Sequence, residues 1–130
     1  MSEQISKFRF KSFRIINSSI KINDDNLNNV ELSIDLKQEG NVLNNNTYES
    51  ILDVYVFNES KTLEVKVKLR GEFEFDNQLD ENQKAKFFEI NAPAILFPYL
   101  RAYISSITGL SGISPIILPT INLSARGKKD

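Results

Sequence analysis

The sequence contains no cysteine and no histidine. Without thiolates and imidazoles, the chain cannot use a cysteine nucleophile, a serine–histidine triad or a zinc site built from Cys and His. Disulfide bonds are excluded as well, so the core alone must hold the fold together. We therefore expect a protein that is not an enzyme and that holds no metal ion and no cofactor.

An excess of charge of one sign is also missing. The 130 residues include 16 Lys and Arg against 17 Asp and Glu, which gives a net charge of −1. Nucleic-acid-binding proteins normally show a basic stripe and a high isoelectric point. We therefore expect no nucleic-acid partner.

Long apolar runs are absent too. No stretch reaches the roughly 18 apolar residues of a membrane-spanning helix, and the first residues lack the apolar core of a signal peptide. The sequence thus predicts a cytoplasmic protein that does not insert into a membrane. The length is typical of one domain, which we place at residues 1–130 with a frayed polar tail at 124–130.

Apolar–polar alternation with a period of two indicates strands, and it occurs over residues 8–22, 30–37, 48–58 and 63–75. In the last segment odd positions are apolar and even positions are mostly charged, which predicts one buried and one wet face. Residues 48–58 are apolar on both sides and are expected to lie centrally. We interpret residues 40–46 as a turn, and a parity change near Lys11 and Ser12 as a bulge.

Helical patterning begins only after the strands. Asp80 opens a segment of good helix formers, with its acids at the N-terminal end where the helix dipole favours them. A break is expected at residues 91–93, followed by a second helix over about 94–108 that stops at Gly109. Strands first and helices after predict an α+β fold: a four-stranded antiparallel sheet with a C-terminal helix packed on one face.

The second helix is apolar nearly all round, with Arg101 as its only charged residue. One sheet can cover only one side of such a helix. The alternative is a core helix of a larger protein, but the chain has no other long helix to cover it. We therefore predict a homo-oligomer in which Arg101 is structural and bonded to a carboxylate or to carbonyl groups. The candidate interface residues are Leu96, Tyr99, Leu100, Tyr103, Ile104 and Ile107.

Residues 113–123 are apolar but contain two prolines, so they form neither a helix nor a central strand. Such a loop either lies on the core or lines a groove.

The C-terminal third of the chain contains a distinctive series of residues: 91–101 (NAPAILFPYLR), Ile104 and Ser105, Gly112, 115–119 (PIILP) and 121–123 (INL). With these residues the chain resembles the SecB family of bacterial protein-export chaperones. The similarity is specific over about residues 87–123, and the order of the strands agrees with it.

This resemblance implies an ATP-independent holdase, which binds non-native polypeptides in apolar grooves and keeps them unfolded, for example for export. It implies a homotetramer assembled as a dimer of dimers, with the long helix at the interface. It also implies that the chain is shortened, since the family continues into a second helix where this sequence ends at Asp130. The alternative is a dedicated SecB-like partner of one protein, such as an antitoxin, without a general export function.

In that family an acidic sheet surface docks the translocation motor SecA. By approximate alignment its acidic positions fall on Ser19, Asn23 and Lys66, with Lys21 and Lys68 nearby. Since none of these positions is acidic here, the sequence does not favour SecA, which is retained only as a possible partner.

The client-binding groove is expected to combine a strand with the proline-punctuated loop, because broad apolar surface suits a holdase. Pairing of client backbone with a sheet edge could add affinity that does not depend on sequence. The alternative is that these side chains build the core. The candidate groove residues are Val30, Leu32, Ile34, Ile116, Ile117, Leu118 and Ile121.

Overall fold

The computed structural model describes residues 7–23, 27 and 30–120 of the chain. Ile121 and the tail at 124–130 lie outside these residues. Four strands come first and three consecutive helical segments follow: β1 (Phe8–Ile22), β2 (Leu32–Asn44), β3 (Thr47–Asn58), β4 (Leu63–Phe75), α2 (Glu81–Lys86), the π-helix η1 (Phe87–Asn91) and α3 (Ala92–Leu110).

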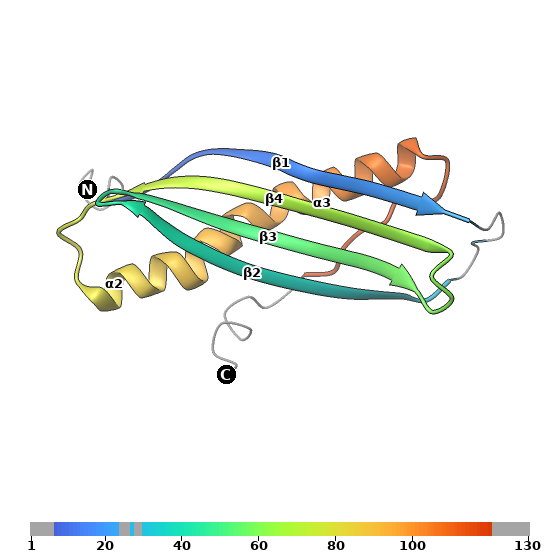
Figure 1. Cartoon of the computed structure of the whole chain (residues 1–130), viewed down its shortest axis with the longest axis horizontal. Coiled ribbons are helices and arrows are strands. Elements are labelled where there is room, and N and C mark those ends of the chain that lie inside the picture. The colour runs from blue at the N-terminus through green and yellow to red at the C-terminus, as the bar shows by residue number, and fades with distance from the viewer. Residues whose placement is uncertain (1–6, 24–26, 28–29, 121–130) are drawn as a thin grey trace.

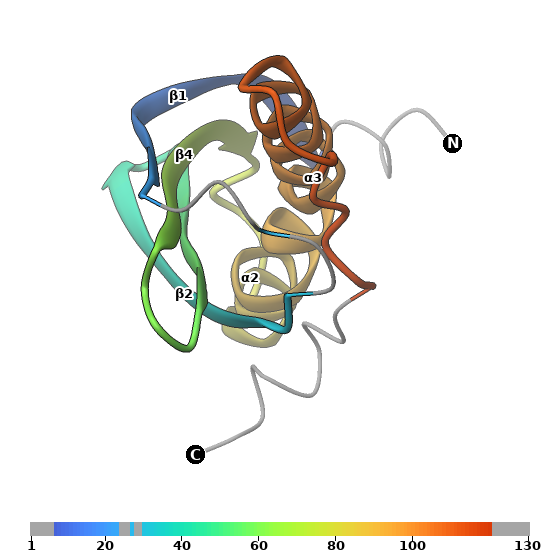
Figure 2. The ribbon, with the colours of Figure 1, turned by 90° about the vertical axis from the view of Figure 1, so that its right-hand side faces the viewer.

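All strand pairs are antiparallel, and the strands lie in the order β1-β4-β3-β2 (Figure 1). The helices pack on one side, which we call the inner face, and the sheet curves around them (Figure 2). The opposite side is the outer face. The α+β prediction is confirmed, and β3 is central as expected.

The first strand is irregular at two places. Its pairing with β4 shifts between Phe10 and Ser12 and again between Ile15 and Asn17. Each shift inserts one residue and reverses which side chains face inward. The first shift is the bulge expected near Lys11, and the second explains why the apolar parity changes back before Ile20.

The prediction of a turn at residues 40–46 is wrong for residues 40–44, which belong to a strand. β2 continues to Asn44, and Gly40 pairs with Ser50 of β3. Glycine weakens a strand, but here it makes room for a neighbour. A Cβ at Gly40 would lie 1.7 Å from the Tyr48 hydroxyl. Cross-strand packing therefore overrides the turn propensity of these residues.

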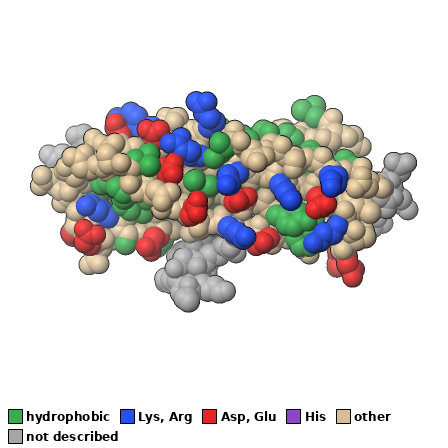
Figure 3. Space-filling view, in the orientation of Figure 1, with side chains coloured by type: hydrophobic (Ala, Val, Ile, Leu, Met, Phe, Trp, Pro, Cys, Tyr) green, Lys and Arg blue, Asp and Glu red, His purple; other side chains and the backbone are tan. Residues whose placement is uncertain are grey.

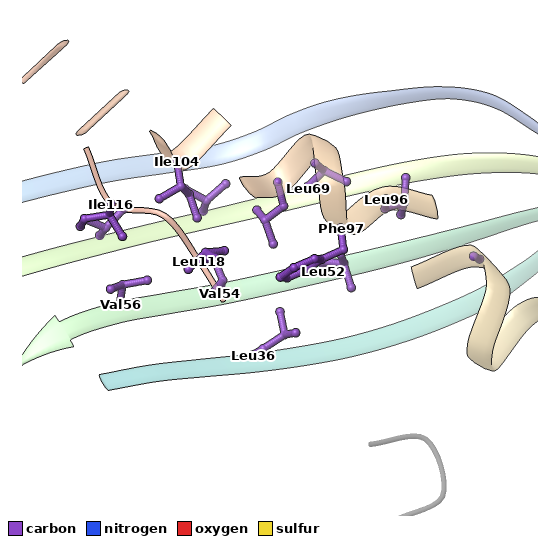
Figure 4. Close-up of a cluster of buried hydrophobic side chains, with 14 of the residues drawn as sticks. Leu36, Leu52, Val54, Val56, Leu69, Leu96, Phe97, Ile104, Ile116 and Leu118 are labelled. Carbon is purple, nitrogen blue, oxygen red and sulfur yellow. The ribbon is translucent and has the colours of Figure 1, made fainter. Parts of the chain in front are cut away.

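The core lies between the inner face and α3. Odd-numbered residues of β4 are buried along its whole length, as predicted. Even-numbered residues of β3 join them, and α3 adds Leu96, Leu100 and Ile104, none of which is exposed to solvent. Figure 4 shows Leu96 and Ile104 over the side chains of the sheet. Burying such aliphatic side chains supplies about 1.5–3 kcal/mol each relative to leaving them in water.

The helical region has no break at residues 91–93. Asp80 caps α2 through a capping box with Gln83, and the chain then passes through η1 directly into α3. Pro93 occupies the first turn of α3, where its missing N–H is tolerated. The helix also runs past Gly109 to Leu110, and Gly112, with φ +93°, reverses the chain instead.

Two side chains of the sheet donate hydrogen bonds to carbonyl groups of η1, close to the point where Pro93 has no N–H to donate. The Tyr48 hydroxyl donates to the Phe88 carbonyl at 3.3 Å, and Gln38 Nε2 donates to the Glu89 carbonyl at 3.4 Å. The rings of Tyr48 and Phe88 also stack, with centroids 3.9 Å apart. Burial, with a smaller effect from Glu89, raises the pKa of Tyr48 to about 12, so its hydroxyl remains a donor at neutral pH.

The closest approach of helix and sheet gives a test of the packing. A Cβ at Gly71 would lie 2.4 Å from Leu96 Cδ2. We expect Gly71→Ala to lower the free energy of unfolding by about 1–3 kcal/mol through overpacking, and Leu96→Ala to lower it by about 2–5 kcal/mol through a cavity. In the double variant the new methyl group fills part of the cavity. Urea denaturation should therefore show that the double variant loses less free energy of unfolding than the two single variants together, by at least about 1 kcal/mol. Additive losses would contradict the contact between Gly71 and Leu96.

Candidate functional site

An open groove of about 640 Å³ lies between the start of β2 and the loop that follows α3. Val30, Leu32 and Ile34 line one side, and Ile116 and Ile117 line the other. The remaining lining residues are Leu27, Leu63, Ile113, Ser114 and Pro115. None of these ten residues carries a charge, and all but Ser114 have aliphatic side chains, so the groove offers uncharged aliphatic side chains next to polar backbone and hydroxyl groups.

The structure brings five of the seven predicted groove residues together. Leu32 remains 37% exposed and Ile117 remains 67% exposed, so these two side chains are the most accessible of the predicted groove residues that the structure describes. Ile116 lines the groove while its side chain is mostly buried. The prediction is wrong for Leu118, whose side chain is fully buried in the core (Figure 4). Ile121 lies outside the described residues.

The loop wall is fixed to α3 by two hydrogen bonds. Thr108 Oγ1 accepts from the Ile116 amide at 2.9 Å and donates to the Ile104 carbonyl at 2.7 Å. Arg101 Nε donates to the Leu118 carbonyl at 2.8 Å, which is the structural role expected for it. After Gly112 reverses the chain, the loop therefore runs back along the helix. Buried Ile116 and Leu118 alternate with exposed Ile117.

The six predicted interface residues divide between two sides of α3. Leu96, Leu100 and Ile104 pack against the chain's own sheet and are fully buried. They are unavailable to another subunit, and the prediction is wrong for these three. Since the helix is apolar nearly all round, its sequence could not show which stripe the sheet would take.

The other three predicted residues retain exposed surface. Tyr103 and Ile107 are half-buried, and Tyr99 is 40% exposed. Tyr99 stacks on Phe13 of β1, with ring centroids 4.5 Å apart, and Phe13 is itself 42% exposed. Ile95, one turn before Tyr99, is 36% exposed. We call Phe13, Ile95 and Tyr99 the exposed patch; every exposed side chain of α3 is uncharged.

Ionisable groups lie mainly on the outer face, where they form hydrogen-bonded pairs. Arg70 Nε donates to Glu49 Oε1 at 2.6 Å, and this bond lowers the pKa of the Glu49 carboxyl. Arg9 makes a similar ion pair with Glu74 and lowers the pKa of that carboxyl. The Arg9–Glu74 pair is exposed and contributes little to stability, whereas the Arg70–Glu49 pair is partly buried. Within the described ranges, no group of three or more acidic residues could hold a metal ion.

The comparisons with known proteins agree with this geometry. The family model of preprotein translocase subunit SecB matches residues 9–126. The chain belongs to the SecB family. Two relatives named protein-export protein SecB come from Anaplasma phagocytophilum, 38% identical over 48% of this chain, and Azoarcus sp., 30% identical over 73% of it. The matched stretches cover 41% and 65% of those relatives, so the chain spans less than two thirds of their length.

A solved SecB-like structure has the same fold. It is the SecB-like chaperone Rv1957 of Mycobacterium tuberculosis, in complex with a ChAD peptide from the HigA1 antitoxin Rv1956. The TM-score is 0.72 with 14% sequence identity, and the match covers 92% of this chain and 95% of that one. In the described part of this SecB family member, no helix combines the length and hydropathy needed to cross a membrane.

Some groove and patch residues were missed by the sequence reasoning. Leu63 and Ile113 lay in segments recognised as a strand and a loop, but nothing in the pattern placed them beside β2. Phe13 gave a usable signal, because the parity change in its strand marks a bulge. Its contact with Tyr99 joins residues 86 positions apart, and local periodicity carries no information about such a contact.

The bond between Thr108 and Ile116 provides a test of how the loop is held. Thr108→Val keeps the shape but leaves the buried Ile116 amide without a partner, so the free energy of unfolding should fall by about 1–3 kcal/mol. Relative to the wild type, hydrogen exchange at the Ile116 amide should become faster in the Val variant by at least the factor by which exchange in the core strands becomes faster. Thr108→Ser retains the hydroxyl and should keep the amide protected. Equal protection in the Val variant would show that the loop is held in another way.

Proposed function

We propose that the chain is an ATP-independent holdase that binds non-native polypeptides in the groove between β2 and the loop and works in the cytoplasm. The observation that carries this proposal is the groove itself, which is open and is lined by uncharged residues with mostly aliphatic side chains. Unfolded segments from unrelated proteins share apolar side chains rather than a sequence, so such a surface can bind many of them. Membership of the SecB family and the names of the curated relatives support the same function.

A dedicated role is the second candidate. The solved SecB-like chaperone carries a peptide from an antitoxin, which supports a chain that serves one partner rather than many clients. The two functions differ in breadth: a general holdase suppresses aggregation of several unrelated unfolded proteins, whereas a dedicated partner acts on one. The general role in export would also require docking to SecA, which direct binding assays with SecA can test.

We also propose that the exposed patch is buried in a homo-oligomer, with a dimer of dimers as the expected form. Phe13 and Tyr99 are large aromatic side chains that together with Ile95 form an apolar surface. Monomeric proteins rarely leave connected aromatic surface in water without a partner. Closed symmetry is the usual solution for soluble homo-oligomers.

The groove can be tested by removing its two most exposed predicted side chains. We expect Leu32→Ser together with Ile117→Ser to weaken binding of unfolded, reduced test proteins roughly tenfold, because two aliphatic anchors are lost. Fluorescence anisotropy and light scattering of aggregating clients would measure this. The matched control is Val42→Ser with Leu43→Ser, since these residues are 55% and 47% exposed at the far end of β2. An equal loss in the control would contradict binding at the groove.

Size-exclusion chromatography with light scattering tests the oligomer. A tetramer of the 14.9 kDa chain would have a mass of about 60 kDa. Tyr99→Lys places a charge in the exposed patch and should yield a smaller species with unchanged circular dichroism. Leu110→Lys is the control, because Leu110 is 87% exposed at the end of α3. A monomeric wild-type chain, or a Tyr99→Lys variant that keeps the wild-type mass, would contradict the proposed interface.

A further inference from the structure

Strand β1 differs in charge from the other three strands. It contains four basic side chains and no acidic one, whereas β2, β3 and β4 each contain at least two carboxylates. Three phenylalanines and four isoleucines lie between the basic residues. β1 therefore combines apolar side chains with positive charge alone. The basic residues are Arg9, Lys11, Arg14 and Lys21.

β1 is also held less regularly than the rest of the sheet. It lies at one edge and pairs only with β4 (Figure 1). Its pairing shifts twice, against one shift in β2 at the opposite edge. Phe13 and Ile16 remain 42% and 48% exposed. A strand with one paired edge and an irregular ladder opens at a lower cost in free energy than a central strand. β1 is therefore an apolar segment that an incompletely folded copy readily exposes.

The groove has properties that complement those of β1. Its lining is uncharged, and its side chains are aliphatic except for Ser114. A second hollow adjoins the groove at Val30, and Glu31 and Glu59 line this hollow. Both glutamates are exposed, and none of the residues that line the hollow is basic. A segment in the groove would place its apolar side chains against aliphatic ones and its basic side chains within reach of carboxylates.

The margin of the sheet beside the groove has an excess of negative charge. Residues 30–44 and the turn at 59–62 together contain four acidic side chains and two basic ones. Acidic side chains are visible along the β2 margin of the outer face (Figure 3). One of the two lysines, Lys61, lies over the Phe57 ring, with Nζ 4.8 Å from the ring centroid. The acidic residues are Glu31, Asp35, Glu39 and Glu59, and the basic ones are Lys37 and Lys61.

We infer that the groove binds residues 8–22 of a second, unfolded copy of this chain. The phenylalanines and isoleucines of the segment would occupy the groove, and its basic side chains would pair with Glu31 and Glu59. Complementary charge selects β1 among the strands, because the carboxylates of the other three would meet carboxylates at this margin. The inference rests on the proposed holdase function and names one client of the groove.

The strand order requires that the bound segment come from another copy. β1 and β2 lie at opposite edges of the sheet, and the groove begins at β2. A folded chain cannot place its own β1 in its own groove without giving up the pairing with β4. An unfolded copy has no such pairing to lose, so its residues 8–22 are free to bind.

The test uses the folded full chain and two fluorescein-labelled peptides, residues 7–23 and residues 47–58. The second peptide is the sequence of β3, which is also apolar but contains Glu49 and Asp53 and no basic residue. Fluorescence anisotropy should show that the β1 peptide binds at least about tenfold more tightly than the β3 peptide. This preference should decrease as salt is raised, because salt screens the exposed charges.

Two variants locate the binding site. Leu32→Ser with Ile117→Ser should weaken binding of the β1 peptide roughly tenfold through the loss of aliphatic contacts. Glu31→Gln with Glu59→Gln should weaken it roughly three- to fivefold and leave the β3 peptide bound no more weakly than before.

The matched control removes the same charge at the other end of the molecule. Glu72→Gln with Glu81→Gln should change the affinity for the β1 peptide less than about twofold.

Three results would overturn the inference. One is binding of the β3 peptide as tight as that of the β1 peptide. Another is unchanged affinity of the β1 peptide in the Leu32→Ser, Ile117→Ser variant, which would place the peptide outside the groove. The third is failure of the β1 peptide to bind while unrelated unfolded proteins do bind, which would leave the holdase function standing. If neither the peptide nor any unfolded protein binds, the holdase function falls as well.

Discussion

The packing of α3 against the inner face of the sheet determines the position of nearly everything else in this chain. Leu96, Leu100 and Ile104 are completely buried between the helix and strands β3 and β4. Gly71 allows this close approach, since no side chain stands between its backbone and Leu96. The loop after α3 is hydrogen-bonded to that helix. One wall of the groove is therefore positioned by the same contact that forms the core.

The two faces of the sheet have different chemistry. The inner face is hydrophobic, with aliphatic and aromatic side chains, and no charged side chain lines the groove at its edge. The outer face holds paired charges, and one end of it carries aromatic rings covered by lysines.

Much of the fold could be predicted from local patterns. The alternation in β4 identified its buried side, and the parity change after Phe10 identified a bulge. The pattern failed where a distant residue decides the structure. Gly40 belongs to a strand because Tyr48 fills the space beside it. Pro93 does not interrupt the helical path because it falls in the first turn of α3, and Tyr48 bonds to the Phe88 carbonyl.

The site was predictable to a similar extent. Val30, Leu32 and Ile34 share one strand face, and Ile116 and Ile117 share one loop, so composition and order suggested both walls. The sequence alone did not show that the two walls meet in one groove. That expectation came from the resemblance to SecB, and the tertiary fold is what brings the walls together. The stripe on α3 was ambiguous for a physical reason. A helix that is apolar on all sides gives no sign of which residues meet the sheet, and only the structure separates Leu100 from Tyr99.

The strand order has a consequence for how the chain folds as it is synthesised. β1 is made before β4 but pairs only with it, across residues 63–75. On the ribosome, β2, β3 and β4 can pair with their sequence neighbours as they emerge, whereas β1 must wait unpaired for about forty further residues. During that interval its phenylalanines have no sheet to cover them. The strand that is made first is thus the last to be paired, and in this period the nascent chain is itself an unfolded apolar segment.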